Sequence, residues 1–422
     1  MPQNTLRAVF CIPEAQEVGG VGSWALQVAR MGIPSRFFVH LERKYRRSPS
    51  AYPASADRIW GTSPWIASVW NVWEFARRYK QALPAAYIPN WSHGTYAACA
   101  LLSRRHSESM RVIGFGHTDQ DHYYRHLAYY EPMIHRFVAV SKEIAEGLRR
   151  ALPHRAKDIE LRPYPIAAPA NLVRSYSAAG QPLRLVYAGR IEQPQKRVLD
   201  LLAIAELLAE RNVNFRLDVY GDGRDENLFR KALAEVPAAT RRFIQWHPKV
   251  PAARMGEVWR AADVCLQTSA YEGISISMLE AMAHGCVPVV TRVSGVAAVV
   301  RPAVTGYFAE VGELYDLAGH LEALAADRAL LARMGRAAQT EIDARFSPER
   351  YAEWFKGLMS DVWNEPARPF PADRPCIPAG APTLPHRWHY YGKRWLLKTY
   401  VNALDRVGIK TPRRNSPLLT SS

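Results

Sequence analysis

The chain has 422 residues, of which 48% are hydrophobic and 22% charged, a composition typical of globular rather than disordered proteins. This length is enough for two domains with separate cores. The formal net charge of +16 favours an anionic partner, and three kinds qualify: nucleic acid, an anionic membrane surface or an anionic substrate. No helix-turn-helix, RRM or zinc-finger pattern occurs, so nucleic acid is disfavoured.

The five cysteines lie far apart and form no C-x-x-C pair, which argues against a disulfide scaffold and a structural zinc site. The N-terminal residues lack the pattern of a signal peptide, and no apolar run reaches the roughly 18 residues of a membrane span. We therefore expect a cytoplasmic protein. Peripheral attachment to the inner face of the membrane stays open, because the chain is strongly basic.

The first half of the chain alternates between strand and helix patterns, as parallel sheets require. A helix is predicted over 23–31. Ser141 precedes Ile144, Leu148 and Leu152, which have helical spacing, and it is expected to cap their helix. The predicted strands are 8–12, 35–39, 86–88, 112–115 and 137–140.

A segment rich in Pro, Ala, Gly and Ser, 166–182, interrupts this alternation and is predicted to be a linker. A second series follows, whose strands are apolar nearly throughout, as expected for strands covered on both faces. These strands are predicted at 183–189, 215–221, 262–269 and 286–291. The sequence thus predicts an α/β protein with two doubly wound, Rossmann-like domains, 1–165 and 183–345, that face a central ligand-binding cleft.

Three segments follow the second domain. A helix over 346–363 is expected to return toward the first domain, and the proline-rich stretch 364–385 is expected to be extended. The tail 386–422 interleaves basic and aromatic residues. It suits an interfacial helix on an anionic leaflet, to which the basic run 43–47 would add, and it suits a helix packed on the first domain equally well.

Two glutamates, Glu272 and Glu280, lie in the segment YEGISISMLE, where a strand gives way to a helix. Eight residues of helix rise about 12 Å, so the two carboxylates cannot share a proton and would grip separate parts of one ligand. Carboxylates accept paired hydrogen bonds from the neighbouring hydroxyls of sugar and ribose. Gly273 allows close backbone approach, and the amides of Ile274 and Ser275 can donate at the helix N-terminus. The alternative is a pair of solvated helix residues.

Two cations, Arg190 and Lys196, follow the predicted strand 183–189. Such a pair would stabilise the charge that develops on a diphosphate leaving group, and an ordinary basic surface loop is the alternative. The glycine loop 19–22 also suits phosphate, but it is not a G-x-G-x-x-G fingerprint, so a dinucleotide oxidoreductase is disfavoured.

Polar side chains also follow two predicted strands of the first domain. His117 and Asp119 lie in GFGHTDQDHYYRH, and Asn90 and His93 lie in IPNWSHG. Closely spaced His and Asp residues are common in a chain with thirteen histidines, so a metal site is disfavoured. His117 is better explained as a residue that recognises hydroxyl groups. Asn90, His93 and Asp119 are weaker candidates for the side of the site that holds the acceptor.

The run 269–313, SAYEGISISMLEAMAHGCVPVVTRVSGVAAVVRPAVTGYFAEVGE, resembles the donor-site signature of family-four retaining glycosyltransferases with the GT-B fold. The resemblance extends to YAGRIEQPQKR, EVGGVGSWALQVAR, GFGHT and FVAVSKEIAEGL and covers about residues 8–360. The sequence departs from the family at RPYPI, at Gln245–Trp246, and at SGVAAVV, which lacks the common acidic residue.

The resemblance implies a role for each matching residue. Arg190 and Lys196 would hold the donor diphosphate, Glu272 would bind the transferred sugar, and His117 would lie beside it. These four form the expected catalytic set. The remaining donor-binding residues implied are Gly20 at the phosphate, Gly273, Ile274 and Ser275 at the sugar hydroxyls, Glu280 with the adjoining Leu279 at the ribose, and His247 to Val250 near the base.

The resemblance also implies a reaction. A hexose would pass from a nucleotide-sugar to a hydroxyl acceptor with retained configuration, without a metal or other cofactor, in the assembly of envelope polysaccharide or glycolipid. The acceptor would be a lipid-linked glycan if the protein is attached to the membrane. Two alternatives remain: another GT-B enzyme, such as a nucleotide-sugar epimerase or a phosphorylase, and a non-catalytic nucleotide-sugar-binding protein. Slow hydrolysis of the donor would distinguish a transferase from a binding protein.

Overall fold

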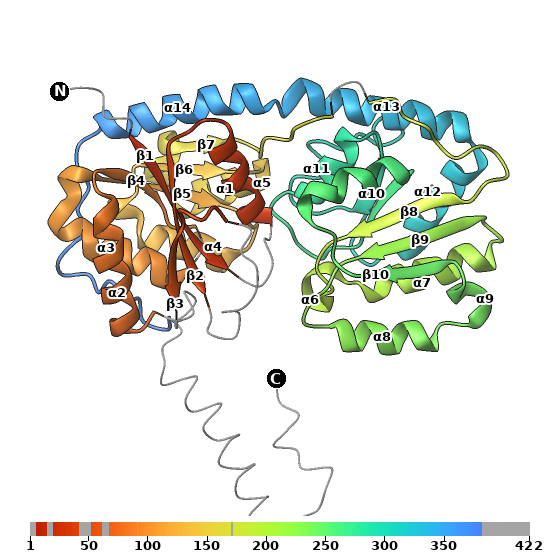
Figure 1. Ribbon diagram of the computed structural model, residues 1–422, viewed down its shortest axis with the longest axis horizontal. Helices are drawn as coiled ribbons and strands as arrows, with labels where there is room; N and C mark the ends of the chain where they lie inside the picture. Colours follow the sequence, from red (N-terminus) through yellow and green to blue (C-terminus); the bar gives the residue numbers. More distant parts are fainter. Residues whose placement is uncertain are drawn as a thin grey trace, which may run out of the picture.

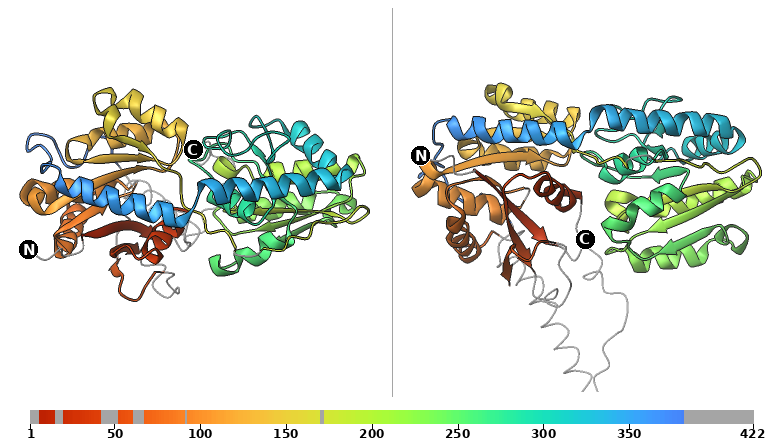
Figure 2. Two further views of the ribbon diagram at one scale, coloured as in Figure 1. Left: turned by 90° about the horizontal axis from the view of Figure 1, so that it is seen from above. Right: turned by 45° about the horizontal axis from the view of Figure 1, so that its top comes forward.

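A computed structural model describes residues 6–14, 20–41, 52–60, 67–90, 92–169 and 172–381. Its described part consists of two α/β domains, side by side, with two long helices that run end to end across both (Figures 1 and 2). The basic run 43–47, the tail 386–422 and Gly19 of the glycine loop lie outside the described residues. The rest of that predicted loop, 20–22, forms the start of helix α1 (Gly20–Arg30) instead.

The first domain is a parallel sheet of strand order β3-β2-β1-β4-β5-β6-β7. Its strands are β1 (Arg7–Glu14), β2 (Ser35–Leu41), β3 (Asp57–Trp60), β4 (Ala85–Ile88), β5 (Met110–Gly116), β6 (Arg136–Ala139) and β7 (Ile159–Leu161). Its helices are α1 (Gly20–Arg30), α2 (Val69–Tyr79), α3 (His93–His106), α4 (Asp121–Tyr129) and α5 (Lys142–Ala151).

The second domain repeats this winding with the strand order β10-β9-β8-β11-β12-β13, again parallel. Its strands are β8 (Leu183–Ala188), β9 (Phe215–Tyr220), β10 (Ile244–His247), β11 (Val264–Gln267), β12 (Val287–Thr291) and β13 (Tyr307–Ala309). Its helices are α6 (Gln193–Lys196), α7 (Leu199–Glu210), α8 (Glu226–Glu235), α9 (Ala238–Arg241), α10 (Met255–Ala261), α11 (Ile276–Ala283), α12 (Leu314–Ala326) and α13 (Arg328–Arg345).

Short 3-10 turns link several of these elements, at Lys80–Ala82, Ser107–Ser109, Glu131–Met133, Pro153–Asp158 and Ala252–Arg254. In each sheet the order reverses beside the first strand, which is the crevice where doubly wound sheets bind ligands at their carboxyl edge. The predicted fold class, two doubly wound α/β domains, is therefore confirmed. Several strands extend beyond their predicted ends, and Ser141 caps α5 by accepting a hydrogen bond from the amide of Ile144.

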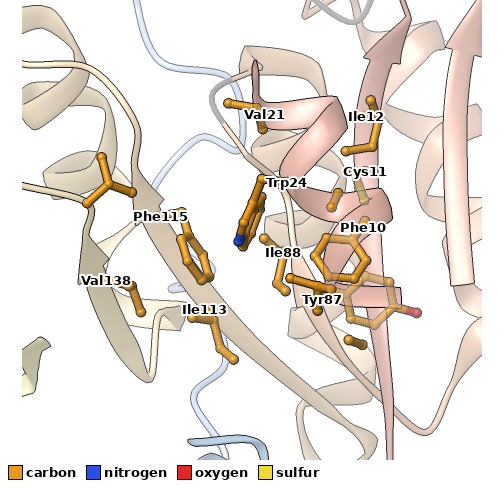
Figure 3. Close-up of a cluster of buried hydrophobic side chains, with 14 of the residues drawn as sticks. Phe10, Cys11, Ile12, Val21, Trp24, Tyr87, Ile88, Ile113, Phe115 and Val138 are labelled. Carbon is orange, nitrogen blue, oxygen red and sulfur yellow. The ribbon is translucent and has the colours of Figure 1, made fainter. Parts of the chain in front are cut away.

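Trp24 of α1 lies at the centre of the first domain's core (Figure 3). Its ring contacts Phe10 edge-on, with centroids 5.6 Å apart, and Phe115, with centroids 4.5 Å apart. Its indole Nε1 donates to the hydroxyl of Tyr351, 2.9 Å away on α14 (Pro348–Asn364). A buried indole needs such an acceptor, so the pairing fixes α14 against the first domain.

The chain therefore returns to the first domain after completing the second. Along α14, Trp354 Nε1 donates to Glu160 of β7, and buried Arg111 donates to the carbonyl oxygens of Val362 and Trp363. The following residues contain no helix or strand over 365–381, and they too lie on the first domain. Phe370 is 1% exposed and packs on the ring of Tyr130.

Candidate active site between the two domains

The YEGISISMLE segment forms a loop and the helix that follows it. β11 ends at Gln267, five residues before Glu272, so Glu272 lies on the loop rather than directly after the strand. The hydroxyl of Thr268 donates to the carbonyl oxygens of Lys196 and Arg197, both at 3.0 Å. The Ser275 hydroxyl caps α11 by accepting from Met278 N. These bonds hold the loop at the carboxyl edge of the sheet, beside the loop that follows β8.

Lys196 and Glu272 form an ion pair at this edge. Lys196 Nζ contacts Glu272 Oε1, and the Ser269 hydroxyl donates to the same oxygen over 2.8 Å. Both charged side chains are mostly buried. The other carboxylate oxygen, Oε2, accepts no hydrogen bond from the described part of the chain. It is therefore the oxygen available to a ligand.

Arg190 lies two residues beyond β8 and is held by side chains of its own loop. Its guanidinium pairs with Glu192 Oε2 at 2.5 Å and donates to Gln195 Oε1. The side-chain amide of Gln195 in turn donates to the carbonyl oxygen of Tyr271 at 3.2 Å. The backbone carbonyl oxygen of Gln195 accepts from the amide of Ala270. Arg190, Lys196 and Glu272, predicted from separate motifs, thus share one network. Sequence reasoning missed Glu192 and Gln195, although both lie between the two predicted cations.

His117 of the first domain lies in a fully bonded aromatic environment. Its Nδ1 is 2.7 Å from the hydroxyl of Tyr164, and its Nε2 is 3.1 Å from Asn90 Oδ1. Asn90 Nδ2 donates to the carbonyl oxygens of Cys11 and Ile88, which leaves Oδ1 as the acceptor on this amide. Nε2 of His117 must therefore carry the proton, and Nδ1 must accept from Tyr164. Burial lowers the pKa of His117 to about 3, which agrees with a neutral ring.

The backbone of His117 contacts the other domain. A Cβ atom at Gly273 would lie 2.0 Å from the His117 carbonyl oxygen, so only glycine fits there. The amide of Asp119 donates to the Glu272 carbonyl oxygen at 3.2 Å. Gly20, the first residue of α1, faces Ile276 at the start of α11, and a Cβ atom at Gly20 would lie 3.2 Å from that side chain. The structure thus brings the predicted residues of both domains together.

Glu280 lies within α11, and its side chain is only partly exposed. No hydrogen bond or ion pair reaches its carboxylate from the described residues. Burial raises the pKa of Glu280 to about 7. A carboxylate that lacks a protein partner and is largely removed from water is strongly stabilised when hydroxyl groups of a ligand donate hydrogen bonds to it.

The remaining predicted donor residues lie on the same domain. His247 ends β10; its Nε2 is 2.6 Å from Asp218 Oδ1, and its ring stacks on Tyr220 with centroids 4.3 Å apart. Val250 follows in the next loop and is partly buried. Ile274 and Leu279 are buried apolar side chains, so their contribution to a ligand site is the shape of the loop and helix they anchor.

A second contact between the domains involves the segment that lacks the acidic residue common in the resembled family. The amide of Gly295 donates to Glu143 Oε2 at 3.0 Å, and the hydroxyls of Ser141 and Ser294 lie 2.7 Å apart. Ser141 and Glu143 belong to the N-terminal end of α5, in the first domain. A carboxylate from the first domain thus bonds this turn of the second.

A small pocket lies on the first domain, beside His117. It is lined by Asn90, Phe115, Gly116, His117, Thr118, Tyr123, His126 and Leu127. The rings of His93 and His126 meet edge-on next to it, with centroids 4.5 Å apart. Buried nitrogen atoms on both, His93 Nδ1 and His126 Nε2, lack hydrogen-bond partners among the described residues. Sequence reasoning found Asn90, His93 and His117 here and missed Thr118 and Tyr123.

The described ranges hold neither a metal-binding cluster nor a membrane-spanning helix. No group of three or more His, Cys, Asp or Glu side chains within those ranges is arranged to hold a metal ion. In the same ranges, no helix combines the length and apolar character needed to cross a bilayer.

Residues 182–327 match the family described as Glycosyl transferases group 1. A D-inositol 3-phosphate glycosyltransferase from Pseudarthrobacter chlorophenolicus is 34% identical over 158 residues, which are 36% of this chain and 37% of that protein. A lipopolysaccharide 1,6-galactosyltransferase from Salmonella typhimurium is 27% identical over 184 residues, 42% of this chain and 50% of that protein. The chain therefore spans half or less of the length of these relatives.

Solved structures resemble the chain over a larger share. HepE from Anabaena, in complex with UDP and glucose, has a TM-score of 0.67 at 12% identity and covers 84% of this chain and all of its own (100%). Sucrose-phosphate synthase from Thermosynechococcus elongatus has a TM-score of 0.66 at 16% identity, over 85% of this chain and 99% of its own. Such neighbours establish the architecture alone. The chain has the GT-B fold, and its residues 182–327 match the family described as Glycosyl transferases group 1.

Proposed function

We propose that the protein is a glycosyltransferase that moves a hexose from a nucleotide diphosphate sugar to a hydroxyl acceptor. One observation carries the proposal: Arg190, Lys196 and Glu272 meet in one hydrogen-bonded network at the carboxyl edge of the second sheet. Two cations suit a diphosphate, and a carboxylate with one free oxygen suits sugar hydroxyls.

Donor binding would exchange the partners of these charges. A diphosphate near Arg190 and Lys196 competes with Glu192 and Glu272 for the two cations. When Lys196 turns to the phosphate, Oε1 of Glu272 is released, and both of its oxygens can accept from hydroxyls of the sugar. The buried carboxylate of Glu280 would accept from the ribose, and the segment from His247 to Val250 would adjoin the base.

The proposed reaction retains the anomeric configuration and uses no metal, as the family resemblance implies. The acceptor oxygen bonds to the anomeric carbon on the face from which the phosphate oxygen departs. That phosphate oxygen takes the acceptor proton, so no side chain serves as nucleophile. Arg190 and Lys196 stabilise the negative charge on the departing diphosphate, which is where such charge stabilisation lowers the barrier most. The ring of His117 is neutral, and both of its nitrogens are bonded to the side chains of Tyr164 and Asn90. It would therefore position its own loop, whereas the sequence favours a residue that recognises hydroxyl groups.

The acceptor would enter from the first domain. The pocket beside His117 is lined by polar side chains that include Thr118, Tyr123 and His126, and it lies on the domain that faces the donor loops. Its chemistry suits a hydroxyl-bearing ring. We further propose a lipid-linked or cell-envelope glycan as the acceptor and a cytoplasmic protein that attaches peripherally to the inner face of the membrane. The similarity to a lipopolysaccharide galactosyltransferase supports this class of acceptor.

The donor is tested by thermal unfolding in the presence of UDP-, GDP-, ADP- and dTDP-sugars. A ligand that binds the folded state raises the midpoint, so one base should stand out. With that donor, slow release of free sugar into water is expected from the native protein. Glu272→Ala should abolish release while the nucleotide still raises the midpoint. Release at an undiminished rate from Glu272→Ala, or no release from the native protein with any donor, would contradict the proposal. The second result would favour a non-catalytic binding protein.

A further inference from the structure

The exposed face of α2 has a composition that solvated helix faces rarely have. Val69, Trp70 and Trp73 are 79%, 68% and 49% exposed. The opposite face, with Val72, Phe75, Ala76 and Tyr79, is buried in the first domain's core. One face of the helix is thus buried, as in other amphipathic helices. The face that is exposed, however, carries large apolar side chains in its first turns.

The same outer face ends in cations. Trp70, Trp73, Arg77 and Lys80 follow one another at intervals of three and four residues, which places them on one stripe of the helix. The two indole rings lie 5.5 Å apart, and the Arg77 guanidinium lies 6.0 Å from the Trp73 ring centre. Between Val69 and Lys80, three cations (Arg77, Arg78 and Lys80) face one carboxylate, that of Glu74, for a local charge of +2.

The start of α2 lies on the edge of the sheet that carries the candidate site. The chain runs from β3 through α2 to β4, so the helix begins at the carboxyl edge, where Asn90 and His117 follow β4 and β5. Three strand spacings separate β3 from β4, which is roughly 15 Å. The N-terminal end of α2 thus lies at the same edge of the first sheet as the pocket.

We propose that the outer face of α2 docks on the surface of an anionic lipid bilayer. Tryptophan suits the boundary between headgroups and acyl chains, because its ring is apolar while its N–H can still donate to water or a headgroup. Arg77, Arg78 and Lys80 complement anionic headgroups, as the chain's net charge of +16 does. The inference does not depend on the proposed activity, since docking requires only this face. It would bring the first domain, which carries the pocket, to the membrane surface.

The test is flotation of the full-length protein with vesicles of phosphatidylcholine, alone or with about 30% phosphatidylglycerol. We expect flotation with the anionic vesicles. Trp70→Ser/Trp73→Ser should weaken binding on the order of tenfold, because partitioning scales with the apolar area buried at the interface. Lys80→Gln should weaken it about fivefold, and added salt should reduce what remains. The matched control is Tyr315→Ser, which removes a 69% exposed aromatic from α12 in the second domain and should change nothing.

Three results would overturn the proposal. They are absence of flotation by the native protein, native-like flotation of the double tryptophan variant, and a double variant that instead loses concentration-dependent self-association in light scattering. The last would identify a second copy of the chain as the partner of α2. Circular dichroism shows whether each variant is folded. Donor hydrolysis in solution should be unchanged in the double variant, so failure of docking and failure of the proposed activity can be told apart.

Discussion

At the scale of single residues, the ion pair between Lys196 and Glu272 is expected to contribute to the stability of the fold. Lys196→Ala leaves a mostly buried carboxylate without its cation. Removing one partner of a buried ion pair costs about 3 kcal/mol, because the remaining charge is not resolvated. Urea unfolding should show this loss. Glu272→Ala should cost a similar amount for the same reason.

The double variant decides whether the two side chains act as a pair. Lys196→Ala/Glu272→Ala should be less destabilised than the sum of the single variants, since neither charge is then left alone. A double variant whose loss equals that sum would mean that the two side chains are stabilised independently. In that case the ion pair would contribute little to holding the loops of β8 and β11 together.

The burial of Glu280 should make the stability of the protein depend on pH. Burial raises the pKa of Glu280 to about 7, from 4.5 in the unfolded chain. Between these values the folded state binds more protons than the unfolded state, so stability from this group falls as pH rises. Glu280→Gln removes the effect. The variant's free energy of unfolding should match the native one near pH 4.5 and exceed it increasingly up to pH 7, by at most about 3 kcal/mol. A difference that is constant over this range would contradict a raised pKa.

Among the elements, the contact between the two site loops depends on Gly273. A methyl group there would lie 2.0 Å from the carbonyl oxygen of His117 and 3.2 Å from the Val140 side chain. The first neighbour is backbone and cannot yield locally, so Gly273→Ala must push the loop of β11 away from the first domain. We expect donor hydrolysis to fall at least tenfold, while circular dichroism shows that both domains remain folded.

Gly357 provides the matched control for this variant. It lies within α14, and a methyl group there would meet nothing within 4 Å. Gly357→Ala should leave hydrolysis unchanged and raise stability by up to about 1 kcal/mol, because alanine favours helix. Equal activity of the two variants would show that the approach of His117 to Gly273 has no bearing on the reaction.

The sequence predicts the winding of both domains well, for a physical reason. Strands such as β8 and β11 are covered on both faces, so their apolar runs are conspicuous, whereas the three-residue β7 offers too few residues for a pattern. The cations and carboxylates of the site are predictable from their positions near strand ends. The hydrogen bonds that fix the tautomer of His117 are not, because Asn90 and Tyr164 lie in distant parts of the sequence.

Across the molecule, the two domains are joined by crossings of the backbone and by contacts between their loops. The backbone crosses once between β7 and β8, where the amide of Ile166 donates to the Phe346 carbonyl oxygen between α13 and α14. Those two helices cross a second time (Figure 2). Noncovalent contacts add to these crossings: Glu143 accepts from the amide of Gly295, and the amide of Asp119 donates to the Glu272 carbonyl oxygen. The bond between Asp119 and Glu272 lies in the candidate site itself, so donor binding would act on loops that already connect the two domains.

Residues 365–381, which follow α14, pack against the first domain. Its proline content predicts an extended segment, but the structure packs Phe370 against Tyr129 and Tyr130, and the Tyr130 hydroxyl donates to the Cys376 carbonyl oxygen. Phe370→Ala should therefore cost about 3 kcal/mol or more in urea unfolding, as the loss of a buried aromatic does. Val173→Ala, at a linker position that is 94% exposed, should cost nothing measurable. Equal stability of the two variants would mean that residues 365–381 are a solvated linker. A selective loss for Phe370→Ala would make this segment part of the first domain, supporting Tyr130, whose ring contacts His126 beside the pocket.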